Sequence, residues 1–396
     1  MKLADKIKKL AGKYHGQAIE TRRHLHRHPE LSFNEYNTAA FVAGKLEEAG
    51  IPFKDKVAVT GLVGIIEGKN PGRKTIALRA DMDALPISEK NDVLYKSVNE
   101  GVMHACGHDV HTTSLLGAAK ILMDLKDEFE GTVRLVFQPG EEKLPGGASI
   151  MISEGVLTNP VPAAMLGQHV MPLIDVGKVG FRSGIYMAST DEIYATVKGK
   201  GGHGAMPHTV IDPVLITSHI IVALQQIVSR NANPIMPSVL SFGKVIANGA
   251  TNVIPDEVYL EGTFRTLDEK WRNDAHVKMK HLAETLAISM GGTCEFNIHK
   301  GYPVLYNNER LTAAAKKHAI DFLGKENVQD LDIWMAAEDF AFYSQHVDAC
   351  FYRLGVRNEA RGIVSSVHTP TFDIDEDALL TGMGLMAYLA IRELEN

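Results

Sequence analysis

Over its first 185 residues, the chain alternates between short apolar runs and longer stretches with helical spacing. The apolar runs at 61–68, 74–86, 132–138 and 163–170 are bounded by Gly, Pro or charged residues, which is typical of buried strands. Between them, 111–125 and 146–157 have the pattern of helices. Residues 19–46 are also mostly helical in pattern, with a break at Pro29. This alternation predicts an α/β fold with a mixed, largely parallel sheet and helices on both faces.

From Tyr186 the order of elements changes. We predict strands at 191–200, 238–247, 257–266 and 293–300, and helices at 213–230 and 268–292. Asp212 and Pro213 form an N-cap and first-turn pair, and Gly291 closes the second helix. The order β-α-β-β-α-β is that of a ferredoxin-like unit. We therefore expect an inserted domain at 186–299, and a catalytic domain formed by 1–185 and 300–396.

Composition narrows the range of possible functions. The 396 residues are too many for one ordinary core, and 45% hydrophobic with 22% charged residues is typical of a globular protein. A net charge of -7 argues against nucleic-acid binding. No apolar stretch is long enough to span a bilayer, and the N-terminal stretch lacks the apolar core of a secretory signal. The three cysteines, at 106, 294 and 350, are far apart and odd in number, so we expect no disulfide framework and a cytoplasmic location.

The stretch "HACGHDVHT", residues 104–112, raises the main chemical question, because Cys106 could be a nucleophile or a metal ligand. Metal-ligating residue types recur at the predicted strand ends and on the loops that enter helices. In an open α/β sheet, both places lie near the carboxyl edge, where sites form. These residues are Asp81, Asp83, Cys106, His108, Glu141, Glu142, His169 and His368. Their convergence favours a metal site, although each residue alone also has an ordinary structural explanation.

Five of these side chains, Cys106, His108, Glu142, His169 and His368, supply mixed S, N and O donors. Such a set suits zinc, manganese, nickel or cobalt better than magnesium or calcium. A single catalytic zinc needs three protein ligands, so five ligands predict two divalent ions. Glu141 is then available as the general base that activates water, and Asp81 could orient a ligand histidine from behind.

The motifs "HRHPELSFNE", "RADMDALPI", "HACGHDVHT", "QPGEE", "GGHGAMPH", "NVIPDE", "GTFR", "EDFAFY" and "VHTP" occur in this order along nearly the whole chain. Together they resemble the amidohydrolase branch of the aminoacylase and carboxypeptidase superfamily of metallopeptidases. That branch includes hippurate hydrolases, plant auxin-conjugate hydrolases and bacterial N-acyl-amino-acid amidohydrolases. The resemblance implies the same five ligands, Glu141 as base, and Asp81 behind the ligands.

The resemblance also assigns roles in the inserted domain, which it identifies as a lid that often forms a homodimer. It implies that His203 polarises the scissile carbonyl, and that Asn252 and Arg265 bind the substrate carboxylate. Arg79 and the cysteine motif depart from the wider superfamily, where a histidine and a bridging aspartate usually stand. This departure leaves the bridging atom and the native metal open.

Three rival interpretations remain beside the metal site. A Cys106–His108 nucleophile would explain neither the two glutamates nor His169 and His368. The "GKGGHG" stretch at 199–204 matches a dinucleotide motif, but Pro207 and Pro213 delay the following helix. A non-catalytic metal-binding protein would not need Glu141. We therefore expect a metal-dependent hydrolase that cleaves the amide bond of N-acyl amino acids, with a dipeptidase or carboxypeptidase as the alternative.

Overall fold

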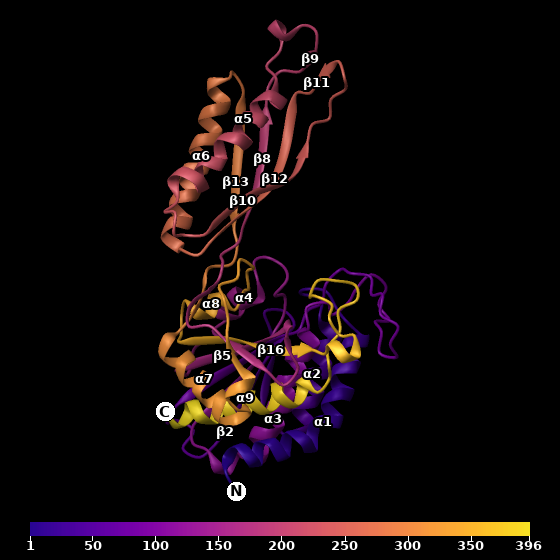
Figure 1. The fold of residues 1–396 in the computed structure, drawn as a ribbon, viewed down its shortest axis with the longest axis vertical. Helices are drawn as coiled ribbons and strands as arrows, with labels where there is room; N and C mark the ends of the chain where they lie inside the picture. Colours follow the sequence, from indigo (N-terminus) through magenta and orange to yellow (C-terminus); the bar gives the residue numbers. More distant parts are fainter. The chain divides into compact units, whose positions relative to one another are not determined.

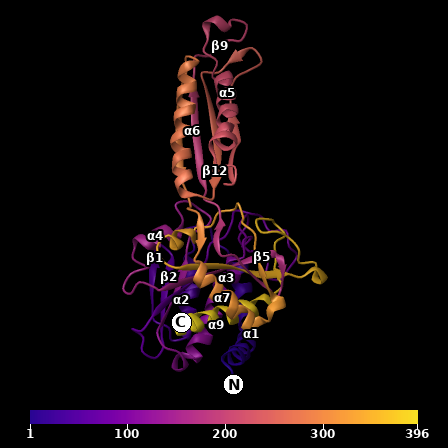
Figure 2. The same cartoon turned by 60° about the vertical axis from the view of Figure 1, so that its left-hand side comes forward.

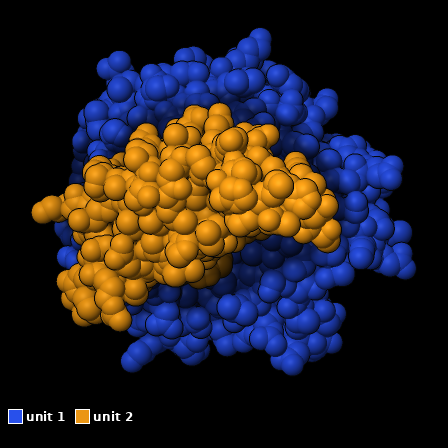
Figure 3. Space-filling view, turned by 90° about the horizontal axis from the view of Figure 1, so that it is seen from above, with its two compact units in different colours: residues 1–186, 306–333, 339–396 blue, residues 187–305, 334–338 orange.

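A computed structural model describes all residues from 1 to 396. The chain divides into two compact units, which are coloured separately in Figure 3. Unit 1 contains residues 1–186, 306–333 and 339–396, and unit 2 contains residues 187–305 and 334–338. No helix is both long and apolar enough to cross a membrane.

Unit 1 is built on an eight-stranded mixed sheet (Figure 1). Its strands in spatial order are β1 (Phe53–Val57), β2 (Gly61–Glu67), β4 (Thr132–Gln138), β3 (Thr75–Asp81), β5 (Ala164–Asp175), β16 (Ala349–Arg357), β6 (Val179–Phe181) and β15 (Val328–Asp330). The four central strands β4, β3, β5 and β16 are mutually parallel. β1 pairs antiparallel with β2, β2 with β4, and β6 with β16, whereas β15 pairs parallel with β6. The predicted fold class is therefore confirmed.

The long helices of unit 1 share one large hydrophobic core with the sheet (Figure 2). They are α1 (Leu3–Arg27), α2 (Tyr36–Glu48), α3 (His108–Asp124), α7 (Glu309–Leu323) and α9 (Ala378–Glu395). Two short helices, α4 (Gly147–Ser153) and α8 (Ala341–Ser344), pack on each other and against β4 and β16. Alternate residues of β4, such as Val133 and Leu135, enter the large core. Every residue of β4 and of its neighbour β3 is buried, so these two strands are covered on both faces.

The carboxyl ends of the central strands meet at one edge of the sheet, as expected for parallel strands. β3 ends at Asp81, and β4 ends at Gln138, just before the two glutamates. His169 does not close its strand, because β5 continues to Asp175. The pairing of β5 with β3 stops at the pair Gly167–Arg79, so His169 lies two residues past the last pair between these strands.

Unit 2 is a four-stranded antiparallel sheet in the order β10 (Ser238–Ile246), β12 (Glu257–Thr266), β8 (Asp191–Lys198), β13 (Thr293–Lys300). Helices α5 (Pro213–Gln226) and α6 (Glu269–Ser289) share its hydrophobic core. This is the ferredoxin-like arrangement predicted from the element order. The Asp212 side chain accepts hydrogen bonds from Val214 N and Leu215 N, so the predicted N-cap is present.

Two small two-stranded sheets complete the architecture. One joins β9 (Gly202–His203) to β11 (Val253–Ile254), and lies beyond one end of the four-stranded sheet of unit 2 (Figure 1). The other joins β7 (Gly184–Met187) to β14 (Leu305–Asn307). None of these short strands was predicted, because segments of two to four residues carry no periodicity.

Candidate metal centre

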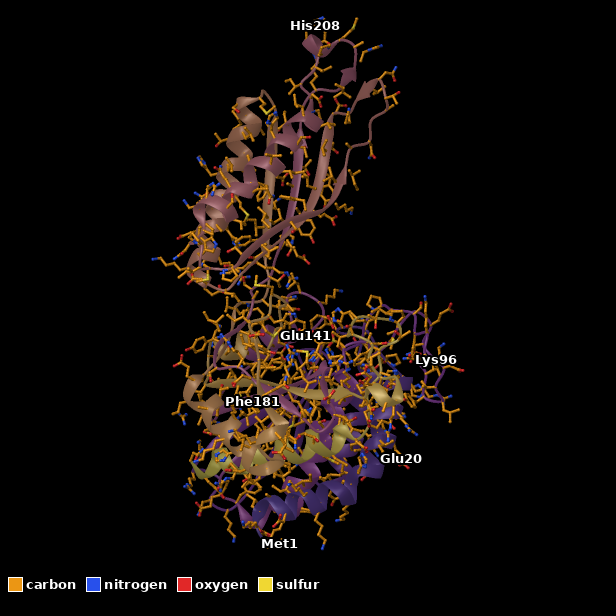
Figure 4. The ribbon with its side chains drawn as sticks, viewed as in Figure 1. Met1, Glu20, Lys96, Glu141, Phe181 and His208 are labelled. Atoms are coloured by element: carbon orange, nitrogen blue, oxygen red, sulfur yellow. The ribbon has the colours of Figure 1, made fainter.

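The five predicted ligands come together at the carboxyl edge of the unit 1 sheet, from four separate segments of the chain. Cys106 lies on the loop before α3, and His108 is the first residue of that helix. Glu142 follows β4, His169 lies on β5, and His368 lies between β16 and α9. Glu141, labelled in Figure 4, lies at the same edge.

Local backbone geometry places Cys106 and His108 on a tight loop. Gly107 between them has φ +81°, a conformation that side chains with a Cβ rarely adopt. A Cβ on Gly107 would also lie 2.5 Å from Val170 Cγ2 on β5. Glycine is therefore required here for the loop to approach the strand that carries His169. His368 also has a positive φ, and its main-chain N donates to Ala105 O at 2.7 Å.

The potential ligand atoms form two groups that share the Cys106 sulfur. One group is Cys106, His108 and His169, and the other is Cys106, Glu142 and His368; within each, the ligand atoms lie within 4.8 Å of one another. Cys106 Sγ is 3.4 Å from His169 Nε2 and 3.3 Å from His368 Nε2. This arrangement suits two cations that share one ligand.

The hydrogen bonds of the ring nitrogens distinguish the histidines that can bind a metal from the one that supports the site. His108 Nδ1 lies 3.2 Å from Asp83 Oδ1, and His169 Nδ1 lies 2.8 Å from Val170 O, so each holds its proton on Nδ1 and presents Nε2. His111 differs, because Val170 N donates to its Nε2 and its Nδ1 donates to Asp81 at 2.6 Å. Both nitrogens of His111 are used, so it supports the site and has no atom left for a metal.

The hydrogen-bonding capacity of the polar atoms in this centre is not fully used by the protein itself. This observation is the main test of whether a metal fits the site. His108 Nε2 is buried and has no hydrogen-bond partner, and the buried Glu142 Oε1 has only an ion-pair contact to His368 Nε2 at 3.2 Å. Buried polar atoms without partners are rare and costly in native proteins. Both atoms face the other ligands, and the set contains one sulfur, three imidazoles and one carboxylate. The residues therefore fit a pair of borderline divalent ions.

Electrostatics lead to the same conclusion. Burial and the nearby charges of Glu142, Glu141 and Asp81 raise the pKa of the Cys106 thiol well above its ordinary value. Burial lowers the pKa of His169 well below its ordinary value, so this imidazole is neutral. A thiol in so negative a pocket ionises only when a cation replaces its proton. Cys106 is thus poorly suited to act as a free thiolate nucleophile.

Asp81 lies behind the ligands, but its hydrogen bonds go to His111 and Arg79. Arg79 Nη1 donates to Asp81 Oδ2 at 2.7 Å, while Arg79 Nη2 donates to Asp339 at 2.8 Å. Burial opposes ionisation of Asp81, yet the Arg79 charge and the nearby histidines keep its pKa well below the ordinary value. Asp81 approaches the ligand His108 only at 3.7 Å.

Asp83 makes the contact that we expected of Asp81. Its Oδ1 pairs with His108 Nδ1, and its Oδ2 accepts from Glu142 N at 3.0 Å. One carboxylate therefore orients two of the five ligands. The sequence placed Asp83 among the candidate residues at this edge, each of which alone also had an ordinary structural explanation. Only the fold brings its two partners, 25 and 59 residues away, to the same carboxylate.

Glu141 lies beside the ligands His108 and Glu142, and Asp339 contacts it. Glu141 is 6% exposed, and its Oε1 accepts from Asp339 N at 3.4 Å. Asp339 also binds Gln138, Arg79 and the main-chain N of Ala148. Asp339 therefore belongs to the buried network that contacts Glu141.

The three candidate residues of unit 2 fall into two places. His203 pairs with Val253 across β9 and β11, and Gly204 N donates to Asn252 O at 2.8 Å, so His203 and Asn252 are neighbours. Both are exposed. Arg265 lies near the other end of β12, where its Nη1 donates to Met335 O at 3.4 Å.

The distance between these two places follows from strand register. Glu257, at the start of β12, pairs with Lys198 near β9, whereas Arg265 is eight residues further along, past the pair Phe264–Asp191. At 3.3 Å per residue, this separates Arg265 from the β9 end by roughly 26 Å.

The remaining sequence motifs have structural explanations. The "GKGGHG" glycines lie before, in and directly after β9, and no long helix begins until Pro213, so the dinucleotide interpretation has no support. His26 is buried and contacts Asp109 and Glu89, whereas His24 stacks on Phe41 at 4.1 Å. These two histidines of α1 therefore have separate structural contacts.

Comparison with known proteins identifies this architecture. The sequence model of peptidase family M20/M25/M40 matches residues 77–392. The chain is 41% identical over 382 residues to N-acetyl-L-cysteine deacetylase of Bacillus subtilis, covering 96% of this chain and 89% of that protein. It is 39% identical to thermostable carboxypeptidase 2 of Saccharolobus solfataricus, covering 99% of both. The crystal structure of the Bacillus subtilis YXEP protein, described as a dinuclear metal binding peptidase, matches with a TM-score of 0.83 at 34% identity, over 97% of this chain and 99% of that one.

Proposed function

The chain belongs to peptidase family M20/M25/M40, and we propose from this that it hydrolyses the amide bond of N-acyl amino acids. The observation that carries the proposal is the pair of ligand groups that share Cys106, with the buried carboxylate of Glu141 beside them. The relative named N-acetyl-L-cysteine deacetylase supports an N-acyl amino acid as the substrate class.

Cys106, His108, Glu142, His169 and His368 would hold two divalent ions of zinc, manganese, nickel or cobalt. When bound, such ions polarise a carbonyl and lower the pKa of water. Glu141 accepts the proton from the attacking water and returns it to the leaving amine. The contact from Asp339 N orients the Glu141 carboxylate toward this task.

The residues of unit 2 would bind the substrate, with Arg265 pairing with its free carboxylate and His203 donating to the scissile carbonyl. An N-acyl amino acid is only about 10 Å long. The spacing along β12 is more than twice that length, so one substrate cannot touch both Arg265 and His203 of the same chain. We therefore propose that His203, with Asn252 beside it, serves the site of a partner copy.

A homodimer through unit 2 would supply that copy. β10 is an edge strand of the unit 2 sheet, and Val239, Val245 and Ile246 on it are exposed. Edge strands with apolar side chains readily pair with another chain. The helix α5 also carries exposed apolar residues, including Leu215 and Val222, which offer a second surface for pairing with another chain.

The first experiment joins metal content to activity. The protein, purified without chelator, should contain close to two metal ions per chain. It should release free amino acid from a panel of N-acetyl, benzoyl and other N-acyl amino acids, lose this activity on chelation, and regain it when metal is restored. Activity that survives chelation but stops on thiol alkylation would instead support Cys106 as a nucleophile.

The same panel tests the second candidate, a carboxypeptidase or dipeptidase, which the relative named thermostable carboxypeptidase 2 favours. Unblocked dipeptides and N-blocked peptides are added to the panel. Higher kcat/KM on these than on every simple N-acyl amino acid would assign the chain to the peptidase class.

Complementation tests the contribution of His203 across a dimer. Glu141→Gln and His203→Ala chains are each expected to be inactive. Co-expressed, they should recover activity, because a mixed dimer joins the intact Glu141 of one chain to the intact His203 of the other. If the mixed dimers are isolated and remain inactive, His203 does not act across the interface.

A further inference from the structure

The N-terminal segment 22–35, "RRHLHRHPELSFNE", lies outside the residues that the family match covers, and the proposed mechanism does not use it. Its side chains nevertheless contact three of the segments that carry or support metal ligands. These contacts are buried, although the segment is far from the ligands in sequence.

The first contact joins α1 to the two segments that follow His108 and His368. The Arg22 side chain is fully buried, and its Nε donates to Asp109 Oδ2 at 2.8 Å. Its Nη2 donates to Asp373 Oδ1 at 2.8 Å. Asp109 is the residue after His108, and Asp373 lies five residues after His368. One guanidinium thus connects the start of α3, which carries His108, to the segment that follows His368.

His26, one turn further along α1, strengthens this connection. Its Nδ1 lies 2.8 Å from Asp109 Oδ2, and its Nε2 lies 3.2 Å from Glu89 Oε1. The loop after Glu89 is bound to the His368 segment, because Lys90 N donates to Pro370 O and Asn91 Nδ2 donates to Phe372 O. The exposed segment that holds His368 is therefore supported from two sides.

The second contact fixes the turn that carries Glu141 and Glu142. Glu35 is fully buried, and one of its oxygens accepts from Gly140 N at 2.8 Å and from Phe33 N at 2.9 Å. The other oxygen accepts from Thr60 Oγ1 at 2.6 Å. The Phe33 ring fills the space beside Gly140, where a Cβ would lie 2.4 Å from it.

The third contact reaches the support of His108. Ser32 Oγ donates to Asp83 Oδ2 at 2.6 Å, and Asp83 binds both His108 and the main chain of Glu142. The segment therefore contacts the supports of His108, Glu142 and His368. His169, by contrast, lies within β5 and gains its position from the sheet.

We propose that segment 22–35 is a clamp that presets the ligand loops, with Arg22 and Glu35 as positioning residues that raise metal affinity. The proposal rests on the proposed metal site. The physical reason is entropic: loops that are ordered before the metal arrives lose less conformational freedom when it binds. Supporting groups behind metal ligands typically change metal affinity by about 10–100-fold.

The test uses the full-length metal-loaded protein and two independent variants, Arg22→Lys and Glu35→Gln. Arg27→Gln on the exposed side of α1 and Glu47→Gln on the exposed side of α2 are the matched controls. Zinc affinity is measured at 25 °C by competition with a chromogenic chelator, after near-ultraviolet circular dichroism has confirmed that each variant is folded. Both clamp variants should bind zinc about 10–100-fold more weakly, and both controls within about twofold of the original protein.

A second measurement separates positioning from a purely structural role. The rise in Tm on zinc addition should be smaller in the clamp variants than in the controls, and zinc should slow hydrogen exchange of the 22–35 amides in the original protein. Folded clamp variants with unchanged zinc affinity and an unchanged zinc-induced rise in Tm would overturn the clamp. If the original protein binds no zinc, manganese, nickel or cobalt, the proposed metal site fails instead. If Arg22→Lys does not fold, Glu35→Gln alone decides the outcome.

Discussion

The two units present their candidate functional residues in opposite ways. In unit 1, Asp81 and His108 are fully buried and Glu141 is 6% exposed, and hydrogen bonds to other elements fix each of them. In unit 2, His203 and Asn252 are exposed, and the one side-chain hydrogen bond of His203 is from its own neighbour, Ala205 N. The candidate residues of unit 1 are therefore held in place by buried contacts, whereas the side chains of His203 and Asn252 in unit 2 are not.

Both units nevertheless contain a buried arginine that joins several strands or loops. In unit 1, Arg79 connects Asp81 to Asp339. In unit 2, Arg272 binds Asp191 on β8, and His276 binds the same carboxylate at 2.6 Å. The first network leads to the metal centre and the second leads to no candidate functional residue. A buried charge network is therefore not by itself a sign of catalysis.

The largest effect should come from Glu141→Gln in unit 1. We expect kcat to fall by about 10³–10⁴-fold, the upper range for loss of a general base, while both metal ions are retained. Steady-state kinetics with metal analysis by mass spectrometry checks both parts. Retained turnover in a fully loaded variant would mean that another group activates the water.

Metal removal should act on one unit only. At about 1,000 times the Kd, bound metal contributes about 4 kcal/mol to the free energy of unfolding of the unit that binds it. Chelation should therefore accelerate hydrogen exchange in unit 1, around 104–112 and 366–373, and leave β8 and β12 of unit 2 unchanged. Equal acceleration of hydrogen exchange in both units would show that metal binding does not stabilise unit 1 alone.

The buried ion pair between Asp191 and Arg272 in unit 2 should contribute to the free energy of unfolding and not to metal binding. Asp191→Asn should lower the free energy of unfolding of unit 2 by about 3 kcal/mol, because Arg272 stays buried with only Glu269 as a charged partner. Burial opposes ionisation of Asp191, but hydrogen bonds from His276 and Arg272 lower its pKa. Its contribution is therefore present above about pH 4 and is lost as the pH falls through the folded-state pKa. Denaturant unfolding between pH 3 and 7 measures this, and the variant should lack the acid-dependent decrease.

The smallest effect should come from Arg265→Ala. Loss of one charge-assisted hydrogen bond to the substrate carboxylate costs about 1.5–3 kcal/mol, which corresponds to a KM roughly 10–100-fold higher. The control is a substrate whose carboxylate is amidated, for which the variant and the original protein should have similar KM values. An unchanged KM for carboxylate substrates would remove Arg265 from the binding site.

Much of the fold was predictable because its long elements carry strong periodicity. The buried strands β3 and β4, the helix α5 with its Asp212 cap, and the ferredoxin-like order of unit 2 all follow from local patterns. The predictions were less accurate where tertiary packing decides, as with the extension of β5 past His169 and the short strands β9 and β11. Pairing with β16 continues β5 to Asp175, and no pattern within the segment indicates that partner.

The sequence by itself determined which residue types could bind metal, because sulfur, imidazole and carboxylate donors at strand ends have few other uses in combination. It also determined that Glu141 would stand beside a ligand, because the two are adjacent in the chain. Only the tertiary structure decided which supports hold them: Asp83 rather than Asp81 on His108, Asp339 beside Glu141, and Arg22 and Glu35 behind the loops. Each of these contacts joins residues between 25 and 198 positions apart. Such contacts exist only after the chain has closed its long loops, so no local pattern can encode them.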